Sequence, residues 1–420
     1  MEKKVLLEFK SNLNSKNNLR YKKKKGKKRK AIFKCLFIIL FFACIFILYP
    51  KLIKIIKQIK IKKRQIRIIT KINEYILICR NGRLINGIKK SSKIPKITVV
   101  LTLYNSEKTI TTSIRSIQNQ NFSDFEIIII DDYSTDKGYN IIKTLQKEDK
   151  RIKIIKNNKN RGALYSRSIG ALKAEGKYIF PLDSDDLFAN EYLFNVCYNE
   201  AEQYNIDILE FSGIFCINGT FPINNDFPKI PLYFKFKANN LVIRSPDIRH
   251  FIYKRSKHKR FRLIDAFLCG KSIKNRIYKG ALNLLGAHIY TQNICYGEDR
   301  IVNFFLYKVA DSFKFIKVYG LIYNLNRQSI TGSHKKIKNC HDELINIMSI
   351  YNYTKNSKEV EIAVYEIMNR WNRILYPGLK SINNKIFLMN LINQMLTCKY
   401  INIKDKIILK KYYAKILSLF

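Results

Sequence analysis

The chain has 420 residues, of which 47% are hydrophobic, and a formal net charge of +46 from 78 Lys and Arg against 32 Asp and Glu. This apolar content supports a sizeable core and argues against wholesale disorder. The 9 cysteines are odd in number and include no Cys-x-x-Cys pair, which argues against a zinc ribbon, a thioredoxin-like site and a disulfide framework.

The positive charge has two interpretations. A bias of this size is typical of a protein that binds a polyanion or an anionic membrane. However, the excess of Lys is spread over the whole chain, so a general bias of composition explains it better than a designed patch. We therefore predict no nucleic-acid partner and keep a basic polyanion-binding membrane protein as an alternative.

The amino-terminal part predicts attachment to a membrane. Residues 1–30 form a basic polar tail, and residues 31–49 are apolar over a length near the lower limit for crossing a bilayer. Bulky residues at the end of this run favour an uncleaved transmembrane anchor over a cleaved signal peptide. Residues 50–95 read as a stalk, with Ile and Leu among Lys at helical spacing, as in a helix on lipid head groups.

The orientation of the anchor follows from the charge on its two sides. Basic residues also crowd the stalk, but the tail is denser in charge and lies nearer the amino terminus. This favours a single-pass membrane protein with a cytoplasmic amino terminus. In a eukaryotic cell, the rest of the chain would then face the lumen of the Golgi or the ER.

From residue 96 the pattern changes to alternating strands and helices. Repeated β-α units of this kind predict an α/β fold with a mostly parallel central sheet and right-handed crossovers. The regular pattern fades after Phe211, and residues 336–420 read as helical with no site signature. The predicted strands cover residues 97–102, 125–130, 152–155 and 178–182, and the predicted helices cover about 109–117, 139–147 and 163–174.

Three carboxylates follow the last of these strands directly. Asp183, Asp185 and Asp186 end an apolar run, where uncompensated negative charges repel one another and resist burial. A divalent cation relieves both problems, and ligands bind at the carboxyl ends of strands in open α/β sheets. The alternative is a solvated Asp-rich turn in which Asp186 caps a following helix.

A further group of acids lies downstream, where the adjacent Glu298 and Asp299 precede an amphipathic helical run. Two adjacent acids in basic surroundings are candidates for a general base that accepts a proton from a hydroxyl group. The alternative is that they only stabilise the amino terminus of that helix.

Polar motifs follow the predicted strands in the order Thr102–Ser106, Asp131-Asp132, Asn160-Arg161-Gly162 and Asp183–Asp186. This ordered set resembles the inverting family 2 glycosyltransferases, which have the GT-A nucleotide-sugar-binding fold. The resemblance runs from about Lys96 to Phe211 and more loosely to Ser333. It implies a Rossmann-like GT-A domain between the anchor and a helical carboxyl-terminal extension. Its parts would be a nucleotide-sugar-binding half at 96–215, an acceptor-binding and catalytic-base half at 216–335, and the extension at 336–420.

The resemblance assigns nucleotide contacts to several residues. Thr102 and Tyr104 would line the base, and Asp132 would accept a hydrogen bond from the uracil N–H. Arg161 and Arg167 would approach the diphosphate and the ribose. Arg327 would also lie near the diphosphate, in a segment that resembles one seen after the acidic pair in many members.

The resemblance also assigns the metal ligands and the base. Asp183 and Asp185 resemble the DxD pair, with Asp183 also counted among the nucleotide-binding residues and Asp185 as the direct ligand of Mn²⁺ or Mg²⁺. Asp186 follows as in the family, and His334 is a weaker candidate for a further ligand. Asp299 matches the catalytic base. One departure is Ser168, where many members have Asn.

Two basic segments are candidates for contact with the acceptor. Residues 271–276 resemble a Lys-rich acceptor-side segment of these enzymes. Residues 254–262 are typical either of a site for an anionic acceptor, such as a phospholipid-linked glycan, or of a solvated loop.

The sequence thus predicts a membrane-anchored inverting glycosyltransferase, a hexosyl- or N-acetylhexosaminyltransferase. It would move a sugar from a nucleotide-diphosphate sugar, a UDP-sugar, to a hydroxyl group of a glycan, lipid or protein. The alternatives are a catalytically inactive relative that binds nucleotide-sugar and the basic polyanion-binding membrane protein.

Overall fold

The computed structural model describes residues 53–54, 67, 70–82, 84, 95–217, 242–245, 268–325, 336–371 and 375–420. The chain divides into two compact units, Met1–Lys71 and Ile72–Phe420, and the elements named below belong to the second. The predicted anchor at 31–49 and the tail before it lie outside the described residues. Within the described ranges, no helix combines the length and the apolar character that a bilayer span needs. The anchor therefore stays a prediction.

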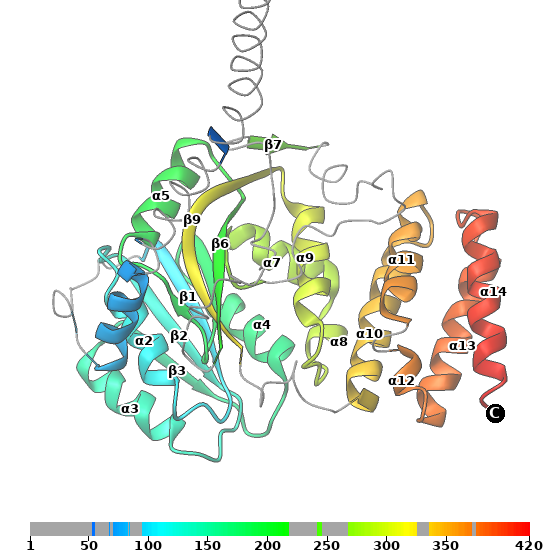
Figure 1. The fold of residues 1–420 in the computed structure, drawn as a ribbon, viewed down its shortest axis with the longest axis horizontal. Coiled ribbons are helices and arrows are strands. Elements are labelled where there is room, and N and C mark those ends of the chain that lie inside the picture. Colours follow the sequence, from blue (N-terminus) through cyan, green and yellow to red (C-terminus); the bar gives the residue numbers. More distant parts are fainter. Residues whose placement is uncertain are drawn as a thin grey trace, which may run out of the picture. The chain divides into compact units, whose positions relative to one another are not determined.

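The four predicted strands are confirmed and form the parallel half of the sheet. β1 pairs in parallel with β2 on one side and β4 on the other, and β2 pairs in parallel with β3. Helices connect them in the expected alternation (Figure 1). The bounds are β1 Ile97–Leu103, α2 Ile110–Gln118, β2 Phe125–Asp131, α3 Gly138–Glu148, β3 Ile152–Lys156, α4 Ala163–Lys173 and β4 Tyr178–Asp183.

The other half of the sheet was not predicted. β8 lies antiparallel between β4 and β6, and the long β9 runs parallel to β6, with β5 and β7 paired to β9. The order is β3-β2-β1-β4-β8-β6-β9-β5. The bounds are β5 Leu187–Phe188, α5 Leu193–Gln203, β6 Ile208–Ile217, β7 Val242–Arg244, β8 Lys271–Lys274, α7 Asn275–Leu285, α8 Ala287–Tyr290, α9 Glu298–Val309 and β9 Ser312–Leu325.

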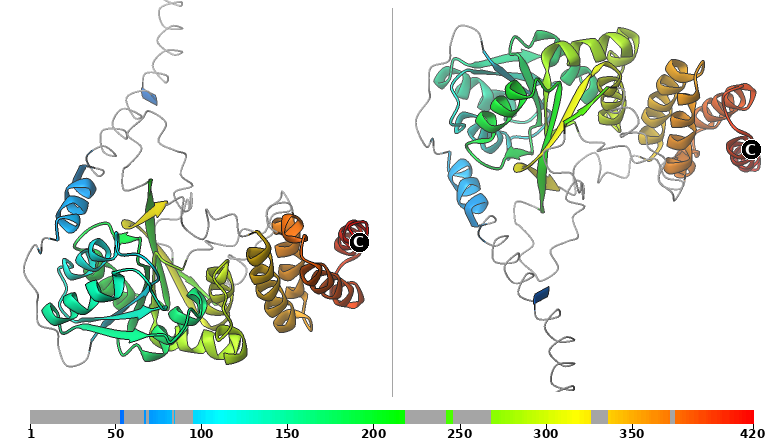
Figure 2. Two further views of the ribbon diagram at one scale, coloured as in Figure 1. Left: turned by 90° about the horizontal axis from the view of Figure 1, so that it is seen from below. Right: turned by 90° about the horizontal axis from the view of Figure 1, so that it is seen from above.

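Helices cover both faces of the sheet because successive strand residues point to opposite faces. Val99 and Leu101 of β1 face the core with α2, α3 and α5, whereas Val100 faces the core with α4, α7 and α9. The two views of Figure 2 show these layers on either side of the strands. Since strands buried on both faces read as continuous apolar runs, this explains the uninterrupted Ile-rich sequence of β2.

The predicted helical extension is also confirmed. Its helices continue the core that contains α7 and α9, since Leu344 and Ile347 of α10 belong to the same buried cluster as Ile301 and Phe305. The bounds are α10 Lys336–Thr354, a 3-10 turn at Lys358–Val360, α11 Glu361–Arg370, α12 Tyr376–Gly378, α13 Ile382–Thr397 and α14 Ile403–Leu417.

The carboxyl-terminal part of the predicted stalk packs on the domain. Residues 72–80 are helical, and the side chains of Ile72, Tyr75, Ile76 and Cys79 are buried at helical spacing. The Tyr75 hydroxyl donates to the Ser116 carbonyl of α2 at 3.1 Å. The apolar face of these turns is thus occupied by protein and is not open to lipid.

Candidate active site at the carboxyl ends of the strands

The three aspartates form a tight turn rather than a helix cap. Asp183 is the last residue of β4, and the backbone N–H of Asp186 donates to its carbonyl at 3.1 Å. The next element is the strand β5, so Asp186 caps no helix there. Instead, Asp186 Oδ1 accepts the backbone N–H of Asn324 in β9 at 2.9 Å. Ser113 of α2 donates to the Ser184 carbonyl at 2.9 Å, which fixes the turn from the other side.

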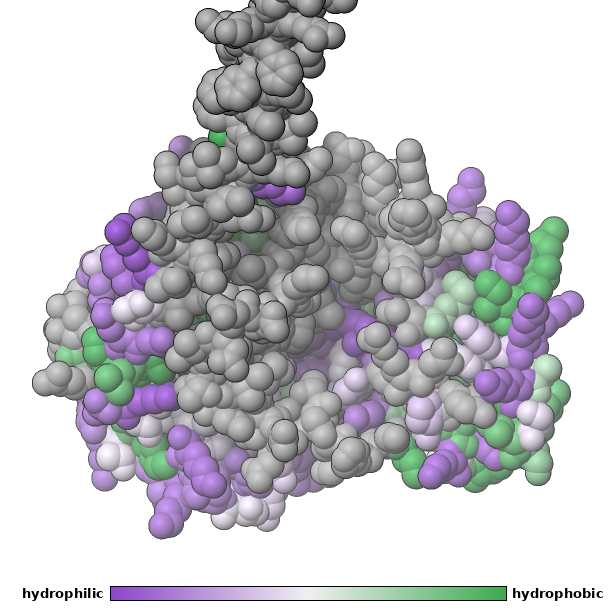
Figure 3. All heavy atoms as spheres, in the orientation of Figure 1, coloured by the Kyte–Doolittle hydropathy of each residue, from purple (hydrophilic) through white to green (hydrophobic). Residues whose placement is uncertain are grey.

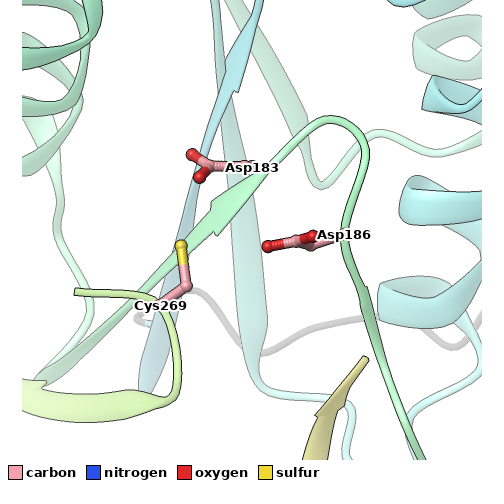
Figure 4. Close-up of side chains that lie close together, drawn as sticks. All are labelled: Asp183, Asp186 and Cys269. Carbon is pink, nitrogen blue, oxygen red and sulfur yellow. The ribbon is translucent and has the colours of Figure 1, made fainter. Parts of the chain in front are cut away.

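Asp183, Asp186 and Cys269 bring their ligand atoms within 4.8 Å of one another. The three side chains converge from the end of β4, the turn after it and the residues before β8 (Figure 4). Asp186 Oδ2 is buried and has no hydrogen-bond partner within the described part of the chain. Burial, followed by the charges of Asp185 and Asp183, raises the pKa of Asp186 well above its usual range. Buried carboxylates left uncompensated in this way fit a divalent cation.

The composition of this cluster differs from the predicted one. Asp185 lies outside the three-residue group, and burial together with Asp183 raises its pKa to about 6. Its role as the direct ligand therefore stays a prediction. Cys269 was not predicted, since it lies far from the aspartates in sequence. Burial, followed by Asp183, raises the pKa of its thiol well above the usual range, which favours the protonated thiol, so the carboxylates are the candidate ligands for a hard cation.

Arg167 of α4 joins this cluster to the acidic pair of Glu298 and Asp299. Its side chain is 4% exposed, and its Nη2 donates to Asp183 Oδ1 at 2.7 Å. Its Nη1 donates to Asp299 Oδ1 at 2.7 Å and to Glu298 Oε1 at 3.0 Å. Burial alone would lower the pKa of Arg167, but Asp183, Asp299 and Glu298 outweigh it and hold the pKa above its usual range. A permanent cation thus lies between the two acidic groups.

The acidic pair is positioned by the start of α9. Gly297 has φ +73 in the left-handed region, which favours glycine, and Glu298 and Asp299 fill the first helical turn. Carboxylates are favoured there by the helix dipole, so the capping interpretation is correct in part. Asp299 Oδ2 also accepts the backbone N–H of Leu268 at 3.2 Å.

The pKa values of the pair suit proton transfer. Burial, followed by the charge of Asp299, raises the pKa of Glu298 to about 8. Burial also raises the pKa of Asp299, although Arg167 opposes the shift. A carboxylate whose pKa is raised toward neutrality is a stronger base than an exposed one and can still be ionised at the operating pH.

The helical extension holds the residues just before this pair, and no pattern in the sequence predicts this contact. Asp342 Oδ2 of α10 accepts the backbone N–H groups of Cys295 and Tyr296 at 3.0 and 3.1 Å. Asn346 Nδ2 donates to the Tyr296 carbonyl at 3.1 Å. In the same first turn of α9, Arg300 forms an ion pair with the buried Glu343 of α10. The extension therefore fixes residues 295 and 296, which lie just before α9 and the candidate base Asp299.

The predicted nucleotide residues gather at the ends of β1 and β2. Thr102 donates to Asp183 Oδ1 at 3.2 Å, and the Tyr104 side chain is exposed. The buried Asp132 accepts three hydrogen bonds: from Asn157 Nδ2 at 2.7 Å and from the backbone N–H groups of Arg161 and Gly162, both at 2.8 Å. It thus orders the loop before α4, and its contact with uracil stays a prediction.

The remaining basic residues divide into two groups. The Arg161 guanidinium lies 4.4 Å from the centre of the Tyr165 ring, partly open to solvent. Lys271 and Lys274 were expected on the acceptor side, but both are buried and paired with Glu210 at 3.5 Å and Asp207 at 3.0 Å. Their ammonium groups thus act inside the fold. The predicted Arg327, His334 and residues 254–262 lie outside the described residues.

Comparisons with known proteins agree with this arrangement. The sequence model of glycosyl transferase family 2 matches residues 98–262. An uncharacterized glycosyltransferase of Methanocaldococcus jannaschii is 34% identical over 210 residues, which cover 43% of this chain and 72% of that protein. UDP-Glc:alpha-D-GlcNAc-diphosphoundecaprenol beta-1,3-glucosyltransferase WfaP of Escherichia coli is 33% identical over 131 residues, covering 31% of this chain and 48% of that enzyme.

The chain spans less than half of some of these relatives, for example 40% of an uncharacterized glycosyltransferase of Haemophilus influenzae that is 42% identical over 100 residues. Among solved structures, Staphylococcus aureus TarS 1–349 in complex with UDP matches with a TM-score of 0.53 at 17% identity. That match covers 77% of this chain and 88% of that one. The fold is therefore GT-A-like, as the resemblance implied. The match to the glycosyl transferase family 2 model and to most of the Methanocaldococcus protein shows that this chain belongs to glycosyltransferase family 2.

Proposed function

We propose that this protein is a membrane-anchored, metal-dependent enzyme that transfers a sugar from a UDP-sugar to a hydroxyl group of a lipid-linked glycan, with inversion at the anomeric carbon. One observation carries the proposal: the Arg167 guanidinium contacts Asp183 on the metal side and Asp299 on the base side. A single displacement needs a group that stabilises the leaving diphosphate and a base that accepts the proton of the acceptor hydroxyl. The candidate metal ligand and the candidate base lie on either side of the Arg167 guanidinium.

The names of similar proteins support the donor and the acceptor. Solved structures of the similarly folded TarS 1–349 contain UDP-GlcNAc or UDP. The name of the E. coli relative specifies UDP-Glc as donor and a diphosphoundecaprenol-linked GlcNAc as acceptor. A diphosphate lipid is anionic, which suits a chain with a net charge of +46. The predicted anchor at 31–49 would keep the enzyme at the membrane that carries such an acceptor.

The reaction follows from the residues of the site. Asp299 accepts the proton of the acceptor hydroxyl while that oxygen attacks the anomeric carbon, and the bond from this carbon to the diphosphate oxygen breaks to release UDP. Arg167 keeps Asp299 and Asp183 in place without changing its own charge. Asp183 and Asp186 would hold Mn²⁺ or Mg²⁺, which when bound stabilises negative charge on the leaving diphosphate.

The test is UDP release by the full chain with Mn²⁺, UDP-glucose or UDP-GlcNAc, and a diphospholipid-linked sugar as acceptor. We expect Asp299→Asn to lower kcat by roughly 10²–10⁴-fold, the contribution of a positioned general base, while UDP binding is retained. Asp311→Asn, which changes an exposed acid before β9, is the matched control. Undiminished kcat in Asp299→Asn would refute the assignment of the base.

A second outcome distinguishes the inactive relative. If the wild-type chain binds UDP in the presence of Mn²⁺ but releases none from any donor across a broad acceptor panel, the protein is a nucleotide-sugar-binding relative and the proposed transfer is wrong.

A further inference from the structure

The last helix, α14, presents apolar side chains to solvent. Ile403 is 78% exposed, Ile407 50% and Leu417 49%. At about 3.6 residues per turn these three lie along one stripe, on the side of the helix that faces away from the buried Asp405 and Ile416. The helix therefore has one apolar face in the core and a second one turned outward, which a solvated helix does not need.

Lysines border the outer stripe on both sides. Helical spacing places Lys404, Lys411 and Lys415 along one edge and Lys406 along the other, whereas Lys410 lies within the stripe, between Ile407 and Leu417 along the helix. Asp405 is the acid of this helix, and it is buried, with its carboxylate bound to Asn402 Nδ2 at 2.8 Å. The outer face of α14 is thus an apolar stripe that lysines flank on both sides and that Lys410 interrupts.

Contacts on the inner side fix which face is turned outward. The Tyr412 ring stacks on Trp371 with centroids 4.0 Å apart, and Lys385 Nζ of α13 donates to the Leu419 carbonyl at 2.6 Å. In Figures 1 and 2, α14 packs beside α13 at the outer end of the helical extension. Figure 3 shows apolar and hydrophilic atoms interspersed over this end. Turning the stripe inward would break the ring stack.

We propose that the outer face of α14 docks on an anionic lipid surface. The apolar stripe would enter the boundary between head groups and acyl chains, and the flanking lysines would extend toward lipid phosphates. Charge complementarity favours this occupant over a second copy of the chain, because two identical faces would oppose like-charged rows. This contact is separate from the predicted anchor and does not depend on the proposed reaction.

The test uses the full chain reconstituted in vesicles of phosphatidylcholine, with or without phosphatidylglycerol. Lysine labelling by an amine-reactive reagent is measured by mass spectrometry. We expect labelling of the exposed Lys404, Lys410 and Lys411 to fall severalfold only in the anionic vesicles. Lys143 and Lys147, which are exposed on α3, are internal references and should label equally in both. Mass spectrometry quantifies the labelling of each lysine separately. Attachment of the chain to the vesicle through another segment therefore does not produce the same result.

Ile407→Glu should abolish the protection, whereas Leu172→Glu, a control on α4 at a side chain 38% exposed, should leave it intact. Unchanged Trp371 emission would show that the fold around α14 is retained. Protection of the wild-type lysines should also disappear at high salt, which tests the charge contribution without any substitution. Equal labelling in both vesicles would overturn the proposal. So would protection in detergent that rises with protein concentration, because it would indicate a second copy of the chain.

Discussion

Arg167 determines the geometry of the site because three carboxylates from two elements converge on its guanidinium. A buried ion pair of this kind is costly to break, since removal of one partner leaves uncompensated charge at a cost of about 3–5 kcal/mol. The resemblance pointed to Arg167 as a diphosphate contact. The structure shows it between the acids, where it fixes the distance from the candidate metal ligands to the candidate base.

The identity of the metal ligands can be resolved by single substitutions. The sequence favours Asp185, whereas the structure groups Asp186 with Asp183 and leaves Asp186 Oδ2 without a partner within the described ranges. We expect Asp186→Asn to weaken Mn²⁺ binding more than Asp185→Asn does, measured by calorimetry on the full chain in the presence of UDP. The opposite order would return the direct ligand to Asp185.

The raised pKa of Glu298 predicts a dependence of stability on pH. Because burial raises this pKa from 4.5 to about 8, the folded state holds a proton that the unfolded state releases between these values. The free energy of unfolding should therefore fall as pH rises through this window, by up to about 1.4 kcal/mol per pH unit for one proton. Glu298→Gln cannot titrate and should show a shallower decline in urea unfolding between pH 6 and 8.

The matched control for that measurement is Glu361→Gln at the start of α11, outside the site, which should leave the slope unchanged. An identical slope in Glu298→Gln and the wild-type protein would show that Glu298 is not the titrating group. A residual slope is expected from Asp299, whose pKa is raised by burial in the same direction.

Among the elements, α10 holds the residues just before the candidate base from outside the GT-A-like sheet. Asp342 accepts hydrogen bonds from the backbone N–H groups of Cys295 and Tyr296, just before α9. A buried N–H donor that loses its acceptor costs about 1–3 kcal/mol of stability. We expect Asp342→Ala to lower kcat more than it raises KM for the donor, because the residues just before α9, the helix that carries Asp299, lose their support. Asp342→Asn retains an acceptor oxygen and should restore part of the activity.

Steady-state kinetics with the donor and the lipid-linked acceptor measure this effect. Asn352→Ala, at an exposed position on the same helix, is the control and should leave kcat and KM unchanged. A loss of thermal stability in Asp342→Ala without any change in kcat would show that α10 stabilises the fold but does not position the base.

At the scale of the whole molecule, the helical extension and the catalytic domain share one core. The buried cluster around α9 continues into α10, α11, α13 and α14, and Arg300 and Arg370 lie between the buried Glu343 and Glu366 across this junction. Because these elements share one core, we expect them to unfold in a single cooperative transition. We expect the emission of Trp371, the 1 Trp of the chain, and far-ultraviolet circular dichroism to report the same urea midpoint.

Loss of UDP binding gives a third probe, which reports on the sheet. Its midpoint should coincide with the other two, and a variant such as Lys143→Ala on the exposed face of α3 should leave all three together. A separate early transition in Trp371 emission would instead identify the extension as an independent domain.

The parallel half of the sheet, the helical extension and the two groups of acids were all predicted from the amino-acid sequence. These features are local: buried strands read as apolar runs, and neighbouring carboxylates in the sequence stay neighbours in the fold. The resemblance to family 2 then assigned roles to Asp183 and Asp299 without coordinates.

Which side chains meet became clear only from the three-dimensional fold. β8 inserts antiparallel between β4 and β6, and this places Cys269 beside Asp183 and Lys271 beside Glu210. Arg167 meets Asp299, and Asp342 meets Tyr296, through contacts between segments distant in the chain. Strand order and helix packing set such contacts, and they depend on the burial of the whole core rather than on the pattern within any one segment.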